Sequence, residues 1–326
     1  MNDAKIIDFL NGRSFAFLCG ALLTVAALLT VFAGRVPGIE TTGGMFFDIK
    51  GTIIDSPLWS MVANVAVVIS IGLLMLLLNK LYNFVKAFTF IGAATFFLLE
   101  LALPVTSAVF DTGTVMCLML VLGALLLFGT YENRQAQRPI FLVMCVLAFF
   151  ALFNWAALVL IVAFFLGFAY MRALNWKGAI AAAIGLFTPF WIVLGLGLAS
   201  PFDFKLIEFN SAWQSLQAGQ MRAMIVWEVA VVVLATVLSV INLLHIYNYR
   251  LQLRVYNAFF LLVTLLSIIG MCVDYRHMST FIPMLNVCLA VQVAHSFTIG
   301  HFPKRHIFIF LLMAAALASF ACNLLL

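Results

Sequence analysis

Two aspartates in one polar segment near the N-terminus are the residues best suited to chemistry. Asp48 and Asp55 lie seven residues apart, so they would lie on one side of that segment if it is helical. A carboxylate there can deprotonate a hydroxyl acceptor or bind a divalent ion, and we predict these two as catalytic residues. The alternative, which stays open, is that Asp48 and Lys50 form an ordinary hydrated pair in a loop.

Four basic residues beside the polar segments could bind a phosphate, because arginine suits bidentate contact with phosphate oxygens. They are Arg35, Lys50, Arg222 and Arg276. Two glutamates, Glu100 and Glu228, lie near the ends of apolar segments. Ionisable residues inside a membrane are costly and are therefore functional candidates. The two glutamates either serve such a role or simply reach the interface or pair with Arg222 or Arg276.

One histidine, His295, lies deep in an apolar run that also contains Asn286 and Gln292. Polar side chains in such runs more often bond neighbouring helices than bind a ligand. The five histidines are scattered along the chain, which excludes the large histidine set of a membrane di-iron oxygenase. The six cysteines have no C-x-x-C spacing, which excludes a zinc knuckle. We predict no metal site, and the sequence leaves any cofactor unknown.

The composition places these residues in a membrane protein. The chain of 326 residues is 66% apolar and 9% charged, whereas soluble domains average about 45–50% apolar and about 25% charged. We therefore predict an all-α, multi-pass transmembrane bundle, residues 1–326 forming a single domain. The net charge of +5 requires no nucleic-acid partner, because the basic residues follow the rule for membrane topology.

Paired basic residues recur between the apolar segments. The pairs are Lys5 and Arg13, Lys80 and Lys86, Arg134 and Arg138, Arg172 and Lys177, Arg250 and Arg254, and Lys304 and Arg305. Short basic loops mark the cytoplasmic side, so each pair predicts a cytoplasmic segment. Because Arg138 and Arg172 must then lie on the same side, the apolar stretch 140–174 must cross twice, and we divide it at Asn154. The result is about 11 spans, with the N-terminus inside and the C-terminus outside.

Acidic residues gather on the opposite, outer side. They are Glu40, Asp48, Asp55, Glu100, Asp111, Asp203, Glu208, Glu228 and Asp274. Two outer loops are long, 34–56 and 200–223. In the second, Leu206, Phe209, Trp213 and Leu216 have helical spacing, which predicts a helix lying in the headgroup plane.

The middle of the chain carries a family resemblance. Asp111 precedes an apolar segment, the basic loop 131–138 follows, then an apolar hairpin, a basic turn at 171–177 and the run Gly185-Leu-Phe-Thr-Pro189. This order is similar to an uncharacterised family of polytopic membrane proteins from Bacteroidetes bacteria. It also distantly resembles the GT-C fold of multispanning glycosyltransferases that use polyprenyl-phosphate sugars. The resemblance covers about a quarter of the chain.

The GT-C resemblance implies a catalytic acid in the first outer loop, here Asp48 or Asp55, and outer basic residues, here Arg222 and Arg276, that bind the lipid phosphate. The substrate-binding residues expected on this basis are Arg35, Lys50, Asp111, Arg222, Glu228 and Arg276. The chain departs from the GT-C pattern because its first outer loop is short and lacks a paired Asp-Asp or Asp-Glu.

Three functions remain open from the sequence. The leading hypothesis is a bacterial inner-membrane protein that handles a polyprenyl-linked sugar at the periplasmic face, by glycosyl transfer or by binding alone. The second is a non-catalytic subunit or assembly factor of a cell-envelope complex, with a protein partner. The third is a lipid or small-solute transporter with a polar cavity around His295, Asn286 and Asn242. Membrane lipid is a partner in every case.

Overall fold

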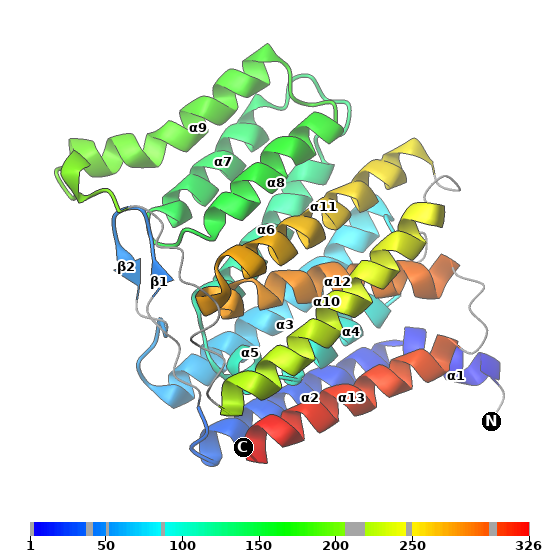
Figure 1. Ribbon diagram of the computed structural model, residues 1–326. Helices are drawn as coiled ribbons and strands as arrows, with labels where there is room; N and C mark the ends of the chain where they lie inside the picture. The colour runs from blue at the N-terminus through cyan, green and yellow to red at the C-terminus, as the bar shows by residue number, and fades with distance from the viewer. Residues whose placement is uncertain are drawn as a thin grey trace.

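The computed structural model describes residues 3–36, 42–49, 52–85, 89–205, 219–245, 250–299 and 305–325. These residues form a bundle of helices with one short β-hairpin (Figure 1). The helices are α1 (Asp3–Asn11), α2 (Arg13–Phe32), α3 (Pro57–Tyr82), α4 (Ile91–Leu101), α5 (Pro104–Ala108), α6 (Thr112–Phe128), α7 (Gln137–Ala151), α8 (Ala157–Tyr170), α9 (Trp176–Gly195), α10 (Gly219–His245), α11 (Leu251–Val273), α12 (Ile282–Ile299) and α13 (Arg305–Leu325). The strands are β1 (Thr42–Gly43) and β2 (Asp48–Ile49), and 3₁₀ turns cover Pro201–Asp203 and Tyr275–Thr280.

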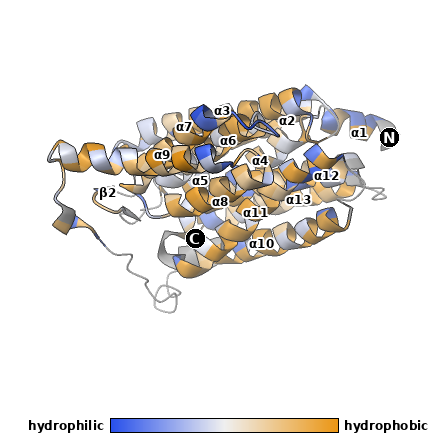
Figure 2. Ribbon diagram, turned by 90° about the horizontal axis from the view of Figure 1, so that it is seen from above, coloured by the Kyte–Doolittle hydropathy of each residue, from blue (hydrophilic) through white to orange (hydrophobic). Residues whose placement is uncertain are grey.

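Six of the described helices are long and apolar enough to cross a membrane. They are α2, α3, α9, α10, α11 and α13, and the shorter apolar helices are α4, α6, α7, α8 and α12. Most of the helical ribbon is coloured as hydrophobic (Figure 2). Many large apolar side chains are exposed, for example Phe17, Phe187 and Trp191. A soluble protein rarely exposes such a surface, so the all-helical fold and its six long apolar helices are consistent with a membrane protein.

The apolar helices follow the order predicted from the sequence, and the predicted break at Asn154 is confirmed. Helix α7 ends at Ala151 and α8 begins at Ala157. Between them the Asn154 side chain accepts a hydrogen bond from the backbone N–H of Ala156, at 2.9 Å. Asparagine favours such turns because its side chain bonds to the backbone two residues on.

The centre of the bundle is formed by α12 and α4. Every described side chain of α4, and nearly every one of α12, is buried. Helix α12 packs against α4, α6, α10 and α11 (Figure 1). A helix that is apolar on all sides is expected to be buried. The few polar side chains of α12 therefore lie in the interior of the protein.

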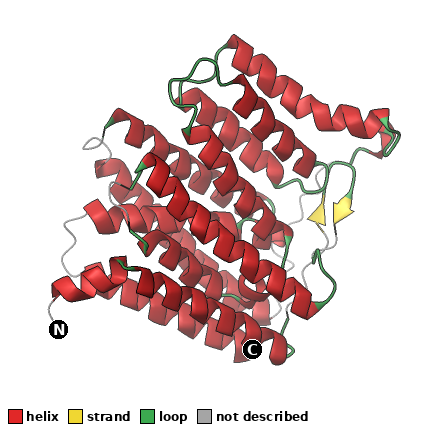
Figure 3. Ribbon diagram, turned by 180° about the vertical axis from the view of Figure 1, so that it is seen from behind, coloured by secondary structure: helices red, strands yellow, loops and turns green. Residues whose placement is uncertain are grey.

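The hairpin lies at one edge of the bundle (Figure 3). Its backbone bonds to the end of α7 and to the connection that leads into α8. Met45 N–H donates to the carbonyl of Ala151 at 3.2 Å, and Trp155 N–H donates to the carbonyl of Gly43 at 3.2 Å. A Cβ on Gly44 would lie 2.3 Å from the carbonyl oxygen of Leu152. Glycine is therefore required where the hairpin touches the backbone of the α7–α8 connection.

The bundle has two chemically different ends. The acidic end carries Asp48, Asp55 and Asp111, and the basic end carries Arg134, Arg172 and Arg254. The turns after α6 and α8 meet at the basic end, where Glu132 N–H donates to the carbonyl of Met171 at 2.9 Å. The predicted surface helix at 206–216 lies outside the described residues.

Candidate functional site

Asp48 forms an ion pair with Lys205 on the surface of the hairpin. The Asp48 side chain is 53% exposed and that of Lys205 is 48% exposed. The hairpin positions both partners, because Lys205 N–H also donates to the carbonyl of Met45 at 3.0 Å. Exposed ion pairs contribute little to stability, so this pair fixes the local geometry more than it stabilises the fold. Lys50, the partner predicted from the sequence, lies outside the described residues.

Asp55 belongs to a segment that crosses the start of α6. Thr52 forms a β-bridge with Asp111, and Ile53 N–H donates to the carbonyl of Phe110 at 3.2 Å. The first predicted outer loop therefore lies against Asp111. Arg35 is exposed just beyond the end of α2. Glu40 and the side chains of Arg222 and Arg276 lie outside the described residues, so their predicted role in phosphate binding stays a prediction.

Asp111 caps the N-terminus of α6. Its Oδ1 accepts from Thr114 N–H at 2.9 Å and from Thr114 Oγ1 at 3.2 Å, as an N-cap aspartate commonly does. The residue is almost fully buried. Burial raises the pKa of Asp111 to about 6, although the hydrogen bonds from Thr114 oppose the shift.

Asn64 of α3 joins this cap to α5. Its Nδ2 donates to the carbonyls of Thr106 at 2.7 Å and Ser107 at 3.0 Å, and its Oδ1 accepts from Thr114 Oγ1 at 2.8 Å. The last carbonyls of a short helix have no partner within the helix. Asn64 supplies a donor to two of them and thereby connects α3, α5 and α6 at the acidic end.

The carboxyl group of Glu100 on α4 is fully buried. Its Oε1 accepts from Asn286 Nδ2 of α12 at 3.1 Å. Among the described residues, Glu100 Oε2 and Asn286 Oδ1 have no hydrogen-bond partner. A buried carboxyl group with a single partner is costly in an apolar interior, so Glu100 is a candidate functional residue.

Glu228 of α10 is the second buried carboxyl group, with 3% of its surface exposed. Neither of its carboxyl oxygens has a hydrogen-bond partner among the described residues. A negative charge on Asp111 or on Glu228 would repel one on Glu100. We call Glu100, Asp111, Glu228 and Asn286 the acid cluster. Two of its members, Asp111 and Glu228, were predicted from the sequence to bind substrate, but the burial of Glu100 and Glu228 was not predicted.

The polar residues of α12 continue from the acid cluster toward the basic end. Gln292 Nε2 donates to Thr264 Oγ1 at 2.9 Å, and Gln292 Oε1 accepts from Ser239 Oγ at 2.9 Å. The prediction that these polar groups bond neighbouring helices is confirmed for Gln292 and Asn286. His295 is buried one turn further on, with its ring 5.8 Å from that of Phe84. Asn286 and His295 are nine residues apart, or about 14 Å along the helix.

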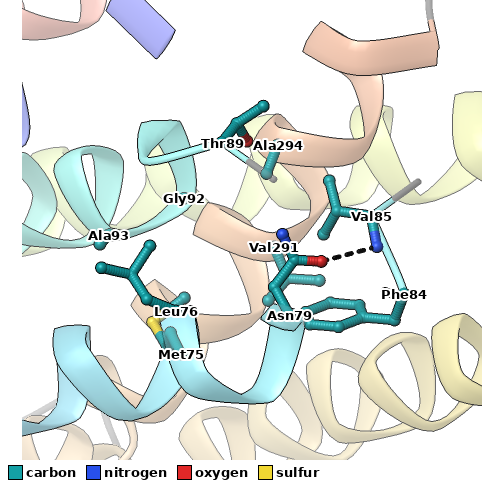
Figure 4. Close-up of a pocket in the computed structure, with 10 residues that line it drawn as sticks. All are labelled: Met75, Leu76, Asn79, Phe84, Val85, Thr89, Gly92, Ala93, Val291 and Ala294. Carbon is teal, nitrogen blue, oxygen red and sulfur yellow. Dashed lines mark hydrogen bonds between the residues drawn. The ribbon is translucent and has the colours of Figure 1, made fainter. Parts of the chain in front are cut away.

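A small cavity lies near His295, between α3, α4 and α12 (Figure 4). Its volume is about 20 Å³, and a cavity of this size has room for a single water molecule. The side chains of Asn79 and Thr89 contribute its polar surface, and Asn79 Oδ1 accepts from Val85 N–H at 3.1 Å. The cavity is too small for a solute, although it would suit one ordered water.

In the described part of the chain, no group of three or more metal-binding side chains lies together. Comparison with protein-family models, curated proteins and solved structures gave no match to this chain. The arrangement of its own side chains is the basis for a functional proposal.

Proposed function

We propose that this chain is a multi-pass protein of a bacterial inner membrane that carries out proton-linked transport of a solute or lipid. In this proposal eleven helices, α2 to α4 and α6 to α13, enter or cross the bilayer. The N-terminus and the basic end face the cytoplasm, and the acidic end and the C-terminus face outward. The paired basic residues support this orientation.

The observation that supports proton linkage best is the buried Glu100 carboxyl group, whose Oε1 accepts a hydrogen bond from Asn286 Nδ2 at 3.1 Å. Carboxyl groups inside a membrane protein commonly belong to proton relays and ion pathways. Glu100 exchanges its proton with the outer side through the acid cluster, next to the segment 52–55. Gln292 and His295 extend the polar line along α12 toward the other side.

Infrared difference spectroscopy on the purified protein tests this without a known substrate. The C=O band of a protonated carboxyl group shifts in D₂O when its proton exchanges. We expect such a band in the wild type, reduced in Glu100→Gln and in Glu228→Gln. Glu132→Gln is the matched control, because Glu132 is exposed. A band that does not shift in D₂O, or that is the same in Glu100→Gln, would refute the proposal.

The second candidate function is the GT-C-like handling of a polyprenyl-linked sugar at the outer face. One observation favours it. The first outer loop carries both predicted catalytic acids, and at Thr52 it lies against Asp111. In this function Asp48, held beside Lys205, positions the acceptor and Asp55 assists. The double variant Asp48→Asn and Asp55→Asn should then change the profile of lipid-linked sugars in cells, and an unchanged profile would rule out the catalytic version.

A further inference from the structure

A groove opens on the side of the bundle between α8, α10 and α11. Its volume is about 390 Å³, within the range of about 300–1,000 Å³ typical of small-molecule sites. Apolar side chains form most of its wall, among them Leu243, Leu261, Leu262 and Leu265. Leu243 and Leu265 are exposed, so the groove opens to the surroundings of the bundle along its length.

The groove exists because α10 and α11 both pack on α12 more closely than on each other. Gln292 of α12 bridges the two helices by accepting from Ser239 and donating to Thr264. These hydroxyl groups form part of the floor of the groove. Their hydrogen bonds are made within the protein, so an apolar occupant would leave none of them without a partner.

The length of the groove matches one leaflet of a bilayer. Along α11 it extends from Ala258 to Ile268, which is about 15 Å at the rise of an α-helix. The hydrocarbon core of a bilayer is about 30 Å thick, so a single acyl chain of one leaflet would fill the groove from end to end.

A basic side chain, Arg254, lies near one end of this groove. Arg254 lies one turn before Ala258 on the same face of α11. Tyr170 lines the groove at the end of α8 and is half exposed, as expected for an aromatic ring at the interface. Arg172 follows two residues later and is paired with Glu132 at 3.5 Å. Basic pockets between transmembrane helices are typical sites for anionic lipid headgroups.

We propose that this groove binds one acyl chain of an anionic phospholipid, whose phosphate contacts Arg254. The apolar wall, the length of one leaflet and the charge at one end all fit this occupant. The site is separate from the acid cluster, and the proposal does not depend on proton-linked transport.

Native mass spectrometry of the detergent-purified protein tests the proposal. The probes are phosphatidylglycerol and phosphatidylcholine with the same acyl chains, added in equal amounts. We expect the wild type to retain more phosphatidylglycerol. Arg254→Gln should lower this preference about five-fold, the effect of one basic residue near an anionic lipid. Arg138→Gln, which removes an exposed charge elsewhere at the basic end, should leave the preference unchanged.

A second set of three variants tests the position of the acyl chain. Leu262→Trp fills the groove and should reduce the retention of both lipids, and Leu261→Phe should do so to a smaller extent. Leu73→Trp places the same ring on an exposed position of α3 and should have no effect. Equal retention of the two lipids by the wild type, or the same lipid counts in Arg254→Gln, would overturn the proposal. So would equal losses in Leu262→Trp and Leu73→Trp.

Discussion

Replacement of Asn64 by leucine should destabilise the acidic end of the bundle by removing three hydrogen bonds at once. Leucine has the same number and branching of side-chain heavy atoms as asparagine but no polar atom, so the change removes the bonds and keeps a side chain of similar shape. The carbonyls of Thr106 and Ser107 lose their donor, and Thr114 Oγ1 loses one acceptor. Interhelical hydrogen bonds in membrane proteins contribute about 0.6 kcal/mol on average and at most about 1.7. Three such bonds give an expected loss of about 2 to 5 kcal/mol.

Reversible unfolding in mixed micelles of a mild detergent and dodecyl sulfate would measure this loss. Ser70→Ala is the matched control on the same helix, because the Ser70 hydroxyl group bonds only to the carbonyl of Ala66 within α3, at 2.7 Å. We expect the control to change the free energy of unfolding by less than about 0.5 kcal/mol. If Asn64→Leu is no less stable than Ser70→Ala, Asn64 does not connect α3, α5 and α6 as described.

Two further predictions concern the hairpin and the cap of α6. Gly44→Ala should destabilise the protein by about 1–3 kcal/mol, because the added methyl group meets the backbone of Leu152, whereas Gly195→Ala, with open space around it, should not. Thermal unfolding would measure both, and equal melting temperatures would contradict the docking of the hairpin. The pKa of Asp111 is raised from its ordinary 3.8 to about 6 by burial, so the folded state binds a proton more tightly than the unfolded state. The stability that the protonated Asp111 carboxyl group gives to the folded state is fully present below about pH 4. It is lost as the pH rises through 6. Asparagine is also a good N-cap, so Asp111→Asn should be more stable than the wild type at pH 7.5 and should have a smaller advantage at pH 5. The same difference in stability at both pH values would refute the raised pKa of Asp111.

The helices could be predicted from the sequence because a bilayer imposes both their length and their apolar character. The break at Asn154 was also predictable, since the basic residues on either side of it required two crossings. The ends of the helices were less predictable. For example, α4 begins at Ile91 and ends at Leu101, whereas the apolar run spans 87–103, because Pro104 begins a separate short helix.

The acid cluster could be predicted only in part. Hydropathy marks Glu100 and Glu228 as unusual, but it does not distinguish a side chain that reaches the interface from one that is buried. The decisive partners are distant in the sequence: Glu100 bonds to Asn286, 186 residues away, and Asp48 pairs with Lys205, 157 residues away. Such pairs depend on which helices become neighbours, and a single sequence contains no local signal for that.

In the proposed orientation, the acid cluster and the first outer loop face away from the cytoplasm. Labelling of single introduced cysteines in intact cells with a membrane-impermeant maleimide tests it directly, after all six native cysteines are replaced by alanine. We predict that Asp55→Cys is labelled in intact cells and that Arg134→Cys is labelled only after the membrane is permeabilised. Labelling of both positions under the same condition, or in the reverse order, would contradict the account.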